Sequence, residues 1–429
     1  MNHIKKILTI GLLLGVSSFL LSCVTQMKQK SKTTALLTAV KKGDLDQIKI
    51  LISKVTNANV KDNDGSTALH LASDRGHLET VKFLINKGAN INVKNNYGWT
   101  ALHLASDKGH LDIVKLLINK GANINAKNND GRTALQMAST AGHLDIVKLL
   151  ISKDTNINAK NNDGSTALHL ASYKGHLETV KFLINKGANI NVKNNYGWTA
   201  LHLASDKGHL DIVKLLINKG ASINTKNNSG WTALHRASDK GHLDTVKFLI
   251  KKDANINVKN NYGWTALHRA SDKGHLETVK FLISKDTNIN AKDNDGWTAL
   301  HLASYKGHLE TVKFLISKDA NINAKDNDGS TALHLASYKG HLETVKFLIN
   351  KGANINVKNN YGWTALHLAS DKGHLDIVKL LINKDANINA KNNRGFTAFQ
   401  LASRKKHSKI MNYLLKQKTF QDNSFQSNQ

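Results

Sequence analysis

Apolar and polar positions repeat along most of the chain with a period of 33 residues. A typical period holds a short Ala-Leu-His-Leu-Ala segment, then Gly-His, then apolar residues three or four positions apart, such as Leu78, Val81, Leu84 and Ile85. Residues at this spacing lie on one face of a helix, so the pattern predicts two helices in every period. One helix pair cannot bury its apolar face alone, and neighbouring pairs must stack to form a core.

Start and stop signals place these helices within the period. Thr67 is a favourable N-cap for a helix over residues 68–73, and Gly76 ends that helix. Gly88 suits the left-handed position after the second helix, which glycine adopts without strain. Asp replaces this second glycine in five periods, where we expect a backbone cost: Asp154, Asp253, Asp286, Asp319 and Asp385.

The unit is built around a Thr-Ala-Leu-His tetrad. Complete tetrads begin at Thr67, Thr100, Thr166, Thr199, Thr232, Thr265, Thr298, Thr331 and Thr364. Degenerate copies begin at Thr34, Thr133 and Thr397. Over residues 34–416 this pattern resembles the ankyrin repeat, in twelve units of which the last is truncated. It departs from the family in one respect, since Ala follows the tetrad Thr where the family has Pro.

The resemblance implies an all-α solenoid of about twelve helix-turn-helix units with β-hairpin fingers. It also implies that the tetrad histidine joins neighbouring repeats by hydrogen bonds. Polar replacements at the two ends, Asp44 in the first unit and Ser408 in the last, are typical of capping repeats. Residues 417–429 are polar and aperiodic, and we expect a disordered tail there.

Residues 1–22 have the features of a secretory signal peptide, in which two lysines precede a long apolar stretch. Leu20-Leu21-Ser22-Cys23 resembles the bacterial lipoprotein box, whose cysteine is acylated and becomes the mature N-terminus. Leu21 is bulkier than the family usually has, but the motif uses the only cysteine of the chain. The resemblance implies lipidation at Cys23, a tether over residues 23–33, and membrane attachment in the bacterial cell envelope, on its periplasmic face or at the cell surface.

Two other interpretations of this segment stay open. An ordinary signal peptide can end in an incidental cysteine, because the motif is short. A permanent transmembrane helix is the less favoured alternative, since such a helix needs roughly 20 apolar residues. With a single cysteine no intramolecular disulfide can form, so the repeats must hold together without one.

The net formal charge of +28 raises the question of an anionic partner. An abundance of Lys and Asn is equally what an AT-rich genome produces, so the charge has a compositional explanation as well. The lysines form four columns around the repeat, exemplified by Lys108, Lys115, Lys120 and Lys127. This spread argues against a groove for nucleic acid.

Signals of catalysis are absent, because the chain has no P-loop, GxSxG, HExxH or GxGxxG motif. Of the 21 histidines, all but His3 belong to the tetrad or to the position after Gly (or after its replacement, Lys406), so we interpret them as structural. The segment 62–65, Asp-Asn-Asp-Gly, begins like a calcium loop but lacks the acid at the twelfth position, so we expect a turn. We therefore predict a non-enzyme with no cofactor and no metal.

Aromatic residues occupy fixed columns of the repeat. All six tryptophans directly precede a tetrad Thr: Trp99, Trp198, Trp231, Trp264, Trp297 and Trp363. Seven tyrosines lie either two residues before a Trp or seven residues after the tetrad Thr: Tyr97, Tyr196, Tyr262, Tyr361, Tyr173, Tyr305 and Tyr338. In the ankyrin family these positions line the concave binding face, so the resemblance implies that these thirteen residues bind a partner.

We predict a monomeric, non-catalytic scaffold that binds a protein through aromatic anchors ringed by charge. Packing of each Trp on a neighbouring finger is the structural alternative for that column. A basic, aromatic-lined face is also suited to an anionic polymer or a glycan, and a steep salt dependence of binding would favour that alternative.

Overall fold

The computed structural model describes residues 2–54 and 57–426, with side chains described for residues 19–54 and 57–418. Over these residues the chain forms 24 helices and no strand, apart from an isolated antiparallel bridge between Lys61 and Thr67. It divides into two compact units, residues 1–196 and 197–429. The all-helical architecture is confirmed, whereas the expected β-hairpin fingers are tight turns without a strand ladder.

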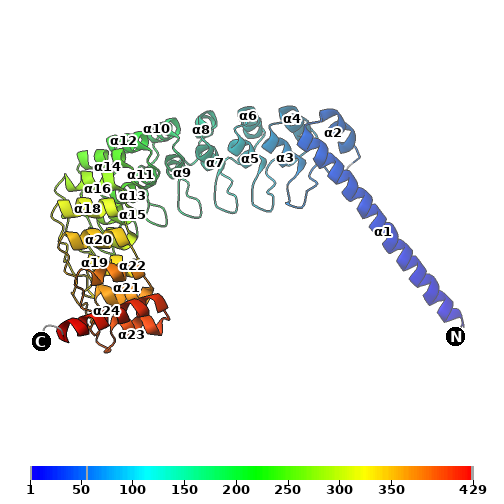
Figure 1. The fold of residues 1–429 in the computed structure, drawn as a ribbon. Coiled ribbons are helices and arrows are strands. Elements are labelled where there is room, and N and C mark those ends of the chain that lie inside the picture. The colour runs from blue at the N-terminus through cyan, green and yellow to red at the C-terminus, as the bar shows by residue number, and fades with distance from the viewer. Residues whose placement is uncertain (1, 55–56, 427–429) are drawn as a thin grey trace. The chain divides into compact units, whose positions relative to one another are not determined.

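The helices form twelve consecutive pairs (Figure 1). The first helices of the pairs are α1 (Asn2–Lys42), α3 (Ala68–Arg75), α5 (Ala101–Lys108), α7 (Ala134–Ala141), α9 (Ala167–Lys174), α11 (Ala200–Lys207), α13 (Ala233–Lys240), α15 (Ala266–Lys273), α17 (Ala299–Lys306), α19 (Ala332–Lys339), α21 (Ala365–Lys372) and α23 (Ala398–Arg404). The second helices are α2 (Leu45–Ile52), α4 (Leu78–Asn86), α6 (Leu111–Asn119), α8 (Leu144–Ile151), α10 (Leu177–Asn185), α12 (Leu210–Asn218), α14 (Leu243–Lys251), α16 (Leu276–Ile283), α18 (Leu309–Ser317), α20 (Leu342–Asn350), α22 (Leu375–Ile382) and α24 (Ser408–Gln426).

Stacking of these pairs within each unit builds the core. First helices pack on the first helices of the next repeat more extensively than second helices pack on each other. On α6, Ile113, Val114 and Leu117 are buried, as the predicted apolar face requires. On α5 even the polar His103 and Ser106 are buried, because this helix lies between two neighbouring first helices.

The tetrad Thr begins each first helix of the complete repeats as predicted. Thr67 is extended, with φ −88° and ψ 169°, and its N–H donates to Nδ1 of His70 at 3.1 Å. Gly76 ends α3 with φ 81°, although the helix extends to Arg75 and not only to the predicted residue 73. A Cβ on Gly76 would approach the ring of His110 in the next repeat to 2.5 Å, so both the backbone and the packing require glycine there.

The tetrad histidine bridges neighbouring repeats. Because Nδ1 of His70 accepts the Thr67 N–H, the proton of the neutral ring lies on Nε2, which donates to the backbone carbonyl of Trp99 at 2.9 Å. Burial lowers the pKa of the equivalent His268 from 6.5 to about 4. The predicted structural role of this histidine column is therefore confirmed.

Asparagine and lysine side chains form hydrogen bonds within and between the fingers that connect the repeats. Oδ1 of Asn95 accepts the N–H groups of Tyr97 and Trp99 at 3.0 and 2.9 Å, which folds the finger tip into a turn. The Asn96 amide donates to Asn63 O in the preceding finger at 3.1 Å. Nζ of Lys94 donates to Lys127 O in the next finger at 2.6 Å. Part of the abundance of Asn and Lys is therefore explained by these structural roles, and not by an AT-rich genome alone.

The first repeat differs from the predicted unit. Residue Thr34 does not cap a helix, because α1 runs through it and its hydroxyl donates to Lys30 O at 2.9 Å. No Gly-containing turn precedes Thr34, so nothing in the local sequence interrupts the helix. Val40 of α1 is buried, and Asp44 caps α2 by accepting the Gln47 N–H at 3.0 Å. The predicted tether over residues 23–33 is likewise helical, while the side chains of most of the predicted signal peptide lie outside the described residues.

The last repeat ends in a longer helix than expected. Ile410 and Leu414 of α24 are buried against the array, and the helix continues to Gln426. Residues 417–426 are thus helical rather than irregular, because they contain no Gly or Pro to end the helix. The final three residues of the predicted tail are outside the described residues.

The five Asp residues that follow second helices all have positive φ, as predicted. For Asp286 the value is 55°. At the equivalent Gly187 a Cβ would meet no atom within 4 Å. The cost of Asp in this position is therefore one of backbone conformation and not of packing.

We expect Asp286→Gly to stabilise the array by about 1 kcal/mol, because glycine adopts this conformation without the Cβ cost. The denaturation midpoint of the variant should rise, and that of the converse Gly187→Asp variant should fall. A lower midpoint for Asp286→Gly would show that the aspartate side chain has a stabilising role of its own.

We also expect stability to fall as the pH drops from 6.5 toward 4. In this range the unfolded chain protonates at His268 while the folded chain, with a pKa of about 4, does not. Gln136 already makes the same contacts in another repeat, accepting from Thr133 N–H at 3.0 Å and donating to Ser165 O at 2.9 Å. His268→Gln should therefore keep the neutral-pH midpoint and reduce its loss on acidification. An unchanged pH dependence would contradict the bridging assignment.

Candidate functional site

The predicted aromatic residues lie on one face of the repeats, which we call the first-helix face. It consists of the finger tips and of the first-helix positions four, seven and eight residues after the tetrad Thr. Tyr97, Trp99, Tyr173 and Tyr196 belong to the first compact unit, and the other nine belong to the second. The four finger-tip tyrosines are between 57% and 59% exposed: Tyr97, Tyr196, Tyr262 and Tyr361.

The tryptophans are partly buried and pack on their own tetrad histidines. The rings of Trp231 and His235 meet edge to face at 5.4 Å between centroids, and those of Trp99 and His103 are 6.4 Å apart. The Trp column thus combines packing on the repeat with a remaining accessible surface. The packing seen here supports the structural alternative for part of each ring, and partner binding by the accessible part stays a prediction.

The tyrosines contact charged groups of adjacent repeats. The hydroxyl of Tyr361 donates to Asp328 at 3.2 Å, across neighbouring fingers. At the helix-end position, Nζ of Lys339 lies 4.4 Å from the ring centroid of Tyr305, in a cation–π contact. Trp297 packs against the same tyrosine edge to face, with 5.3 Å between the ring centroids. The face therefore mixes aromatic rings with charge, as predicted.

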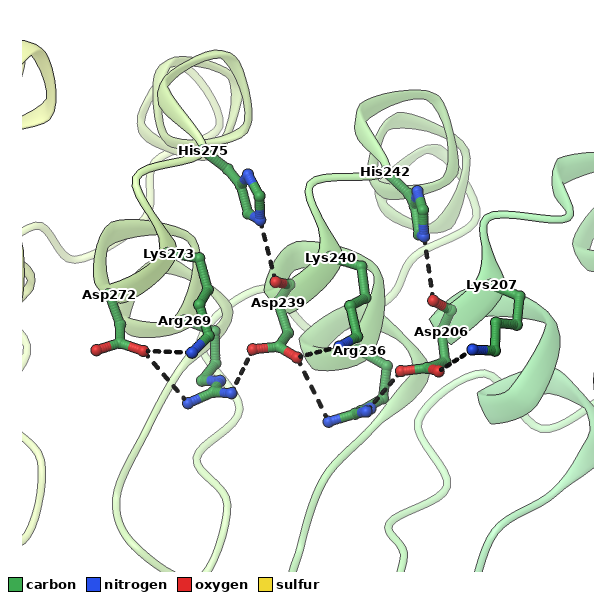
Figure 2. Close-up of polar contacts among 10 residues, drawn as sticks. All are labelled: Asp206, Lys207, Arg236, Asp239, Lys240, His242, Arg269, Asp272, Lys273 and His275. Carbon is green, nitrogen blue, oxygen red and sulfur yellow. Dashed lines mark hydrogen bonds and ion pairs between the residues drawn. The ribbon is translucent and has the colours of Figure 1, made fainter. Parts of the chain in front are cut away.

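Sequence reasoning missed an arginine–aspartate ladder on this face in the second unit (Figure 2). The ladder consists of Asp206, Arg236, Asp239, Arg269 and Asp272. Arg236 pairs with Asp206 at 2.5 Å and with Asp239 at 3.6 Å. Arg269 repeats this arrangement one repeat later, hydrogen-bonded to Asp239 and 3.7 Å from Asp272.

The ladder lies against the tryptophan column. The guanidinium of Arg236 is 4.8 Å from the ring of Trp198, and that of Arg269 is 5.0 Å from the rings of both Trp231 and Trp264. The ladder carboxylates are largely buried, with 4% of Asp239 exposed, and a buried carboxylate needs such partners. The sequence signal for this feature is Arg in place of Leu after the tetrad, at positions 236 and 269 only.

A hollow of about 400 Å³ opens on the same face in the first unit. Tyr97 and Trp99 form aromatic walls, and Asp74, Asp107 and Asp130 contribute carboxylates. Leu104, Lys108, Asn95 and Asn129 complete the lining. In a chain with a net charge of +28, this is a local concentration of negative charge.

The equivalent position of the last repeat carries the opposite charge. A smaller hollow of about 260 Å³ is lined there by Arg394, Phe396, Arg404 and Lys405, with Trp363 and Asp371 from the preceding repeat. Arg404 lies over the ring of Phe396 at 4.7 Å. The same columns of the repeat therefore present different charges at different places along the array.

The predicted lipidation site lies on α1. Cys23 is partly exposed, and its neighbours Leu20 and Leu21 are 57% and 70% exposed. Among the residues that the structure describes, none of the helices combines the length and apolar character that a membrane crossing requires. Within the same residues, no three His, Cys, Asp or Glu side chains lie where they could hold a metal ion.

The turn predicted at 62–65 forms, and the same sequence, Asp-Asn-Asp-Gly, also forms a turn at 293–296 and at 326–329. Asp293 Oδ1 accepts the N–H groups of Asp295 and Trp297 at 2.9 and 2.8 Å, in the role that Asn95 has in other fingers. Burial raises the pKa of the Asp293 carboxyl, although these backbone donors act in the opposite direction.

Comparison with known proteins agrees with the geometry of the repeat. The family model for ankyrin repeats in three copies matches residues 11–95, 88–161, 154–227, 224–293, 285–359 and 351–425. No curated protein matches the chain. Because the family model spans the whole repeat array, with its tetrad caps, histidine bridges and paired helices, the chain belongs to the ankyrin-repeat family.

Proposed function

We propose that this protein is a membrane-anchored, non-catalytic scaffold that binds a protein partner on its first-helix face. Ankyrin repeats are in general protein-binding modules, and this fold presents side chains rather than a reaction centre. The observation that carries the proposal is the concentration of Trp and Tyr on one face, at positions that the core does not need. Ser66 and Ser165 occupy the Trp position in other repeats of the same fold.

The chemistry of the face favours a protein over a uniform polymer. Carboxylates, lysines and aromatic rings alternate along it, as in the Tyr361–Asp328 and Lys339–Tyr305 contacts. Aromatic anchors surrounded by mixed charge are typical of protein interfaces. A polyanion would instead require one continuous basic groove.

The net charge of +28 supports an anionic polymer or glycan as the second candidate. The lysine column of the fingers is already engaged, since Lys94 and Lys259 donate to carbonyls of the next finger. Many second-helix lysines pair with an acid of their own helix, as Lys115 does with Asp112 at 3.3 Å. These contacts leave less free positive charge than the composition suggests.

Attachment through an acylated Cys23 is supported by the lipoprotein-like motif and by the exposure of the apolar side chains before it. Two or more acyl chains hold a protein stably at a membrane, whereas one alone is marginal. Such an anchor would place the array in the bacterial cell envelope. The repeats then act as a scaffold at the membrane surface.

The attachment can be tested with Cys23→Ser, which should leave an unprocessed precursor that incorporates no fatty-acid analogue in metabolic labelling. Ser22→Ala, which keeps a small residue before the cysteine, is the matched control and should still be labelled. Undiminished labelling of Cys23→Ser would refute acylation at this residue.

The binding face can be tested by replacing Trp198, Trp231, Trp264 and Trp297 with Ser. The fold should persist, because the backbone N–H of residue 231 is held by Asn227 Oδ1 at 2.9 Å whatever the side chain. Partner affinity should fall by several kcal/mol if some of these rings are interface hot spots, measured by calorimetry.

The matched control replaces Lys214, Lys247, Lys280 and Lys313, which are exposed on second helices of the same unit, with Ser. It should leave a protein partner's affinity unchanged. A loss in the lysine variant that equals or exceeds the loss in the tryptophan variant would favour the polyanion instead. Unfolding of the tryptophan variant would assign these rings to stability.

A further inference from the structure

One internal arginine shows what chemistry the first-helix face accepts. Arg269 stacks on Trp264 and lies between Asp239 of the preceding repeat and Asp272 of its own. Lys240 and Lys273 flank these two carboxylates at 3.7 and 3.2 Å. The guanidinium thus sits in a cage of two indole rings, Trp231 and Trp264, and two carboxylates, which matches its planar shape and its several donors.

Most of this cage also exists five repeats earlier, without its arginine. The repeat of Thr100 has Trp99 in the place of Trp264, and Asp74 and Asp107 in the places of Asp239 and Asp272. The flanking cations also correspond, since Arg75 lies 3.7 Å from Asp74 and Lys108 lies 3.3 Å from Asp107. Two positions differ. Leu104 stands where the other repeat has Arg269, and Ser66 stands where it has Trp231, so Trp99 is the one indole wall that the earlier cage keeps.

Exposure distinguishes the filled cage from the open one. The side chains of Asp239 and Asp272 are 4% and 7% exposed, whereas those of Asp74 and Asp107 are 28% and 27% exposed. All three residues of the open cage, Trp99, Asp74 and Asp107, line the hollow of about 400 Å³. The space and the carboxylates that an arginine occupies in one repeat are therefore accessible from solvent in the other.

This combination occurs once in the array. Every other repeat with Leu or Met after the tetrad lacks an Asp at one or both of the two helix-end positions, as Tyr305 and Tyr338 illustrate around Leu335. Asp130 adds a third carboxylate to the rim of the hollow. The open cage is thus a specific feature of the first unit and not a general property of the repeat.

We propose that the hollow around Trp99 binds an arginine side chain of the partner protein, in the manner in which the chain binds its own Arg269. This inference rests on the proposed function and names the chemistry of one contact within it. The guanidinium stacks on Trp99 and donates to Asp74 and Asp107. A lysine ammonium fits less well, because it is a compact charge that does not stack in a plane or bridge two carboxylates as a fork.

The test titrates the full chain with N-acetyl-arginine methylamide and follows the Trp99 indole N–H by nuclear magnetic resonance. A saturable shift is expected for the arginine probe. The citrulline analogue has the same shape without the charge. Both it and the lysine analogue should bind at least about tenfold more weakly than the arginine probe. An equal response to citrulline or to lysine would overturn the assignment to a guanidinium.

Two variants test the cage by adding an arginine to the open one and by removing the arginine from the filled one. Leu104→Arg should place a guanidinium in the hollow, as in the native Arg269 repeat, and abolish binding of the arginine probe. The matched control Leu335→Arg adds the same cation on the same column between Tyr305 and Tyr338, and should leave binding intact. Arg269→Leu should create a second site, detected at the Trp264 indole. Retained binding in Leu104→Arg, or no new response in Arg269→Leu, would refute the cage.

Measurements of partner binding distinguish a failure of this inference from a failure of the proposed function. If the tryptophan variants lose the partner but Leu104→Arg does not, the face binds a protein and the arginine contact is refuted. If the arginine probe binds the hollow but the tryptophan variants keep full partner affinity, the proposed function fails while the cage stands as a site for arginine.

Discussion

The hydrogen bond from the tetrad histidine to the next repeat, within each compact unit, is the interaction on which the repeats depend. The histidine ring is buried. It accepts the backbone N–H of the N-cap residue of its own helix and donates to a carbonyl of the following finger, as His235 does to Trp264 at 2.9 Å. A buried imidazole with both nitrogens satisfied costs little, whereas a charged one would be expensive. Burial therefore lowers the pKa of His235 to about 4 and keeps the bridge neutral. Where the next finger carries a Trp, as at Trp264, the bridge holds the backbone of that residue.

Because this stacking is fixed by the tetrad, the first-helix face can vary without disturbing the core. Within the second unit, Arg in place of Leu turns two repeats into a charged ladder, and Tyr in place of Asp turns others into aromatic contacts with lysine. In the first unit the same positions leave an open, acidic and aromatic hollow. The array is thus a regular frame on which a few columns carry the specificity.

The fold could be predicted from the sequence because its determinants are local and repeated. Thr67 as a cap, Gly76 as a helix end and the apolar stripe of α4 each follow from one short segment, and twelve copies reinforce the interpretation. The prediction was wrong where the local signals are missing. Thr34 has no turn before it, so α1 continues through it, and residues 417–426 contain no helix breaker.

The candidate site was only partly predictable. The aromatic columns were visible in the sequence, but the partial burial of each Trp depends on its contact with a histidine ring, which spacing alone does not show. Predicting the ladder would have required the knowledge that the Arg269 side chain reaches Asp239 of the preceding repeat, 30 residues earlier in the chain. The open cage is defined by comparing two repeats in space. The partner-binding role and the acylation of Cys23 remain predictions.

The most direct measurement of the central claim is the tautomer of the tetrad histidines, read from the ¹⁵N chemical shifts of their side chains at neutral pH. The account predicts neutral rings with the proton on Nε2 and an unprotonated Nδ1, for every repeat in which Nδ1 faces the Thr N–H. Rings protonated on Nδ1, or on both nitrogens, would contradict the bridge and the stacking built on it.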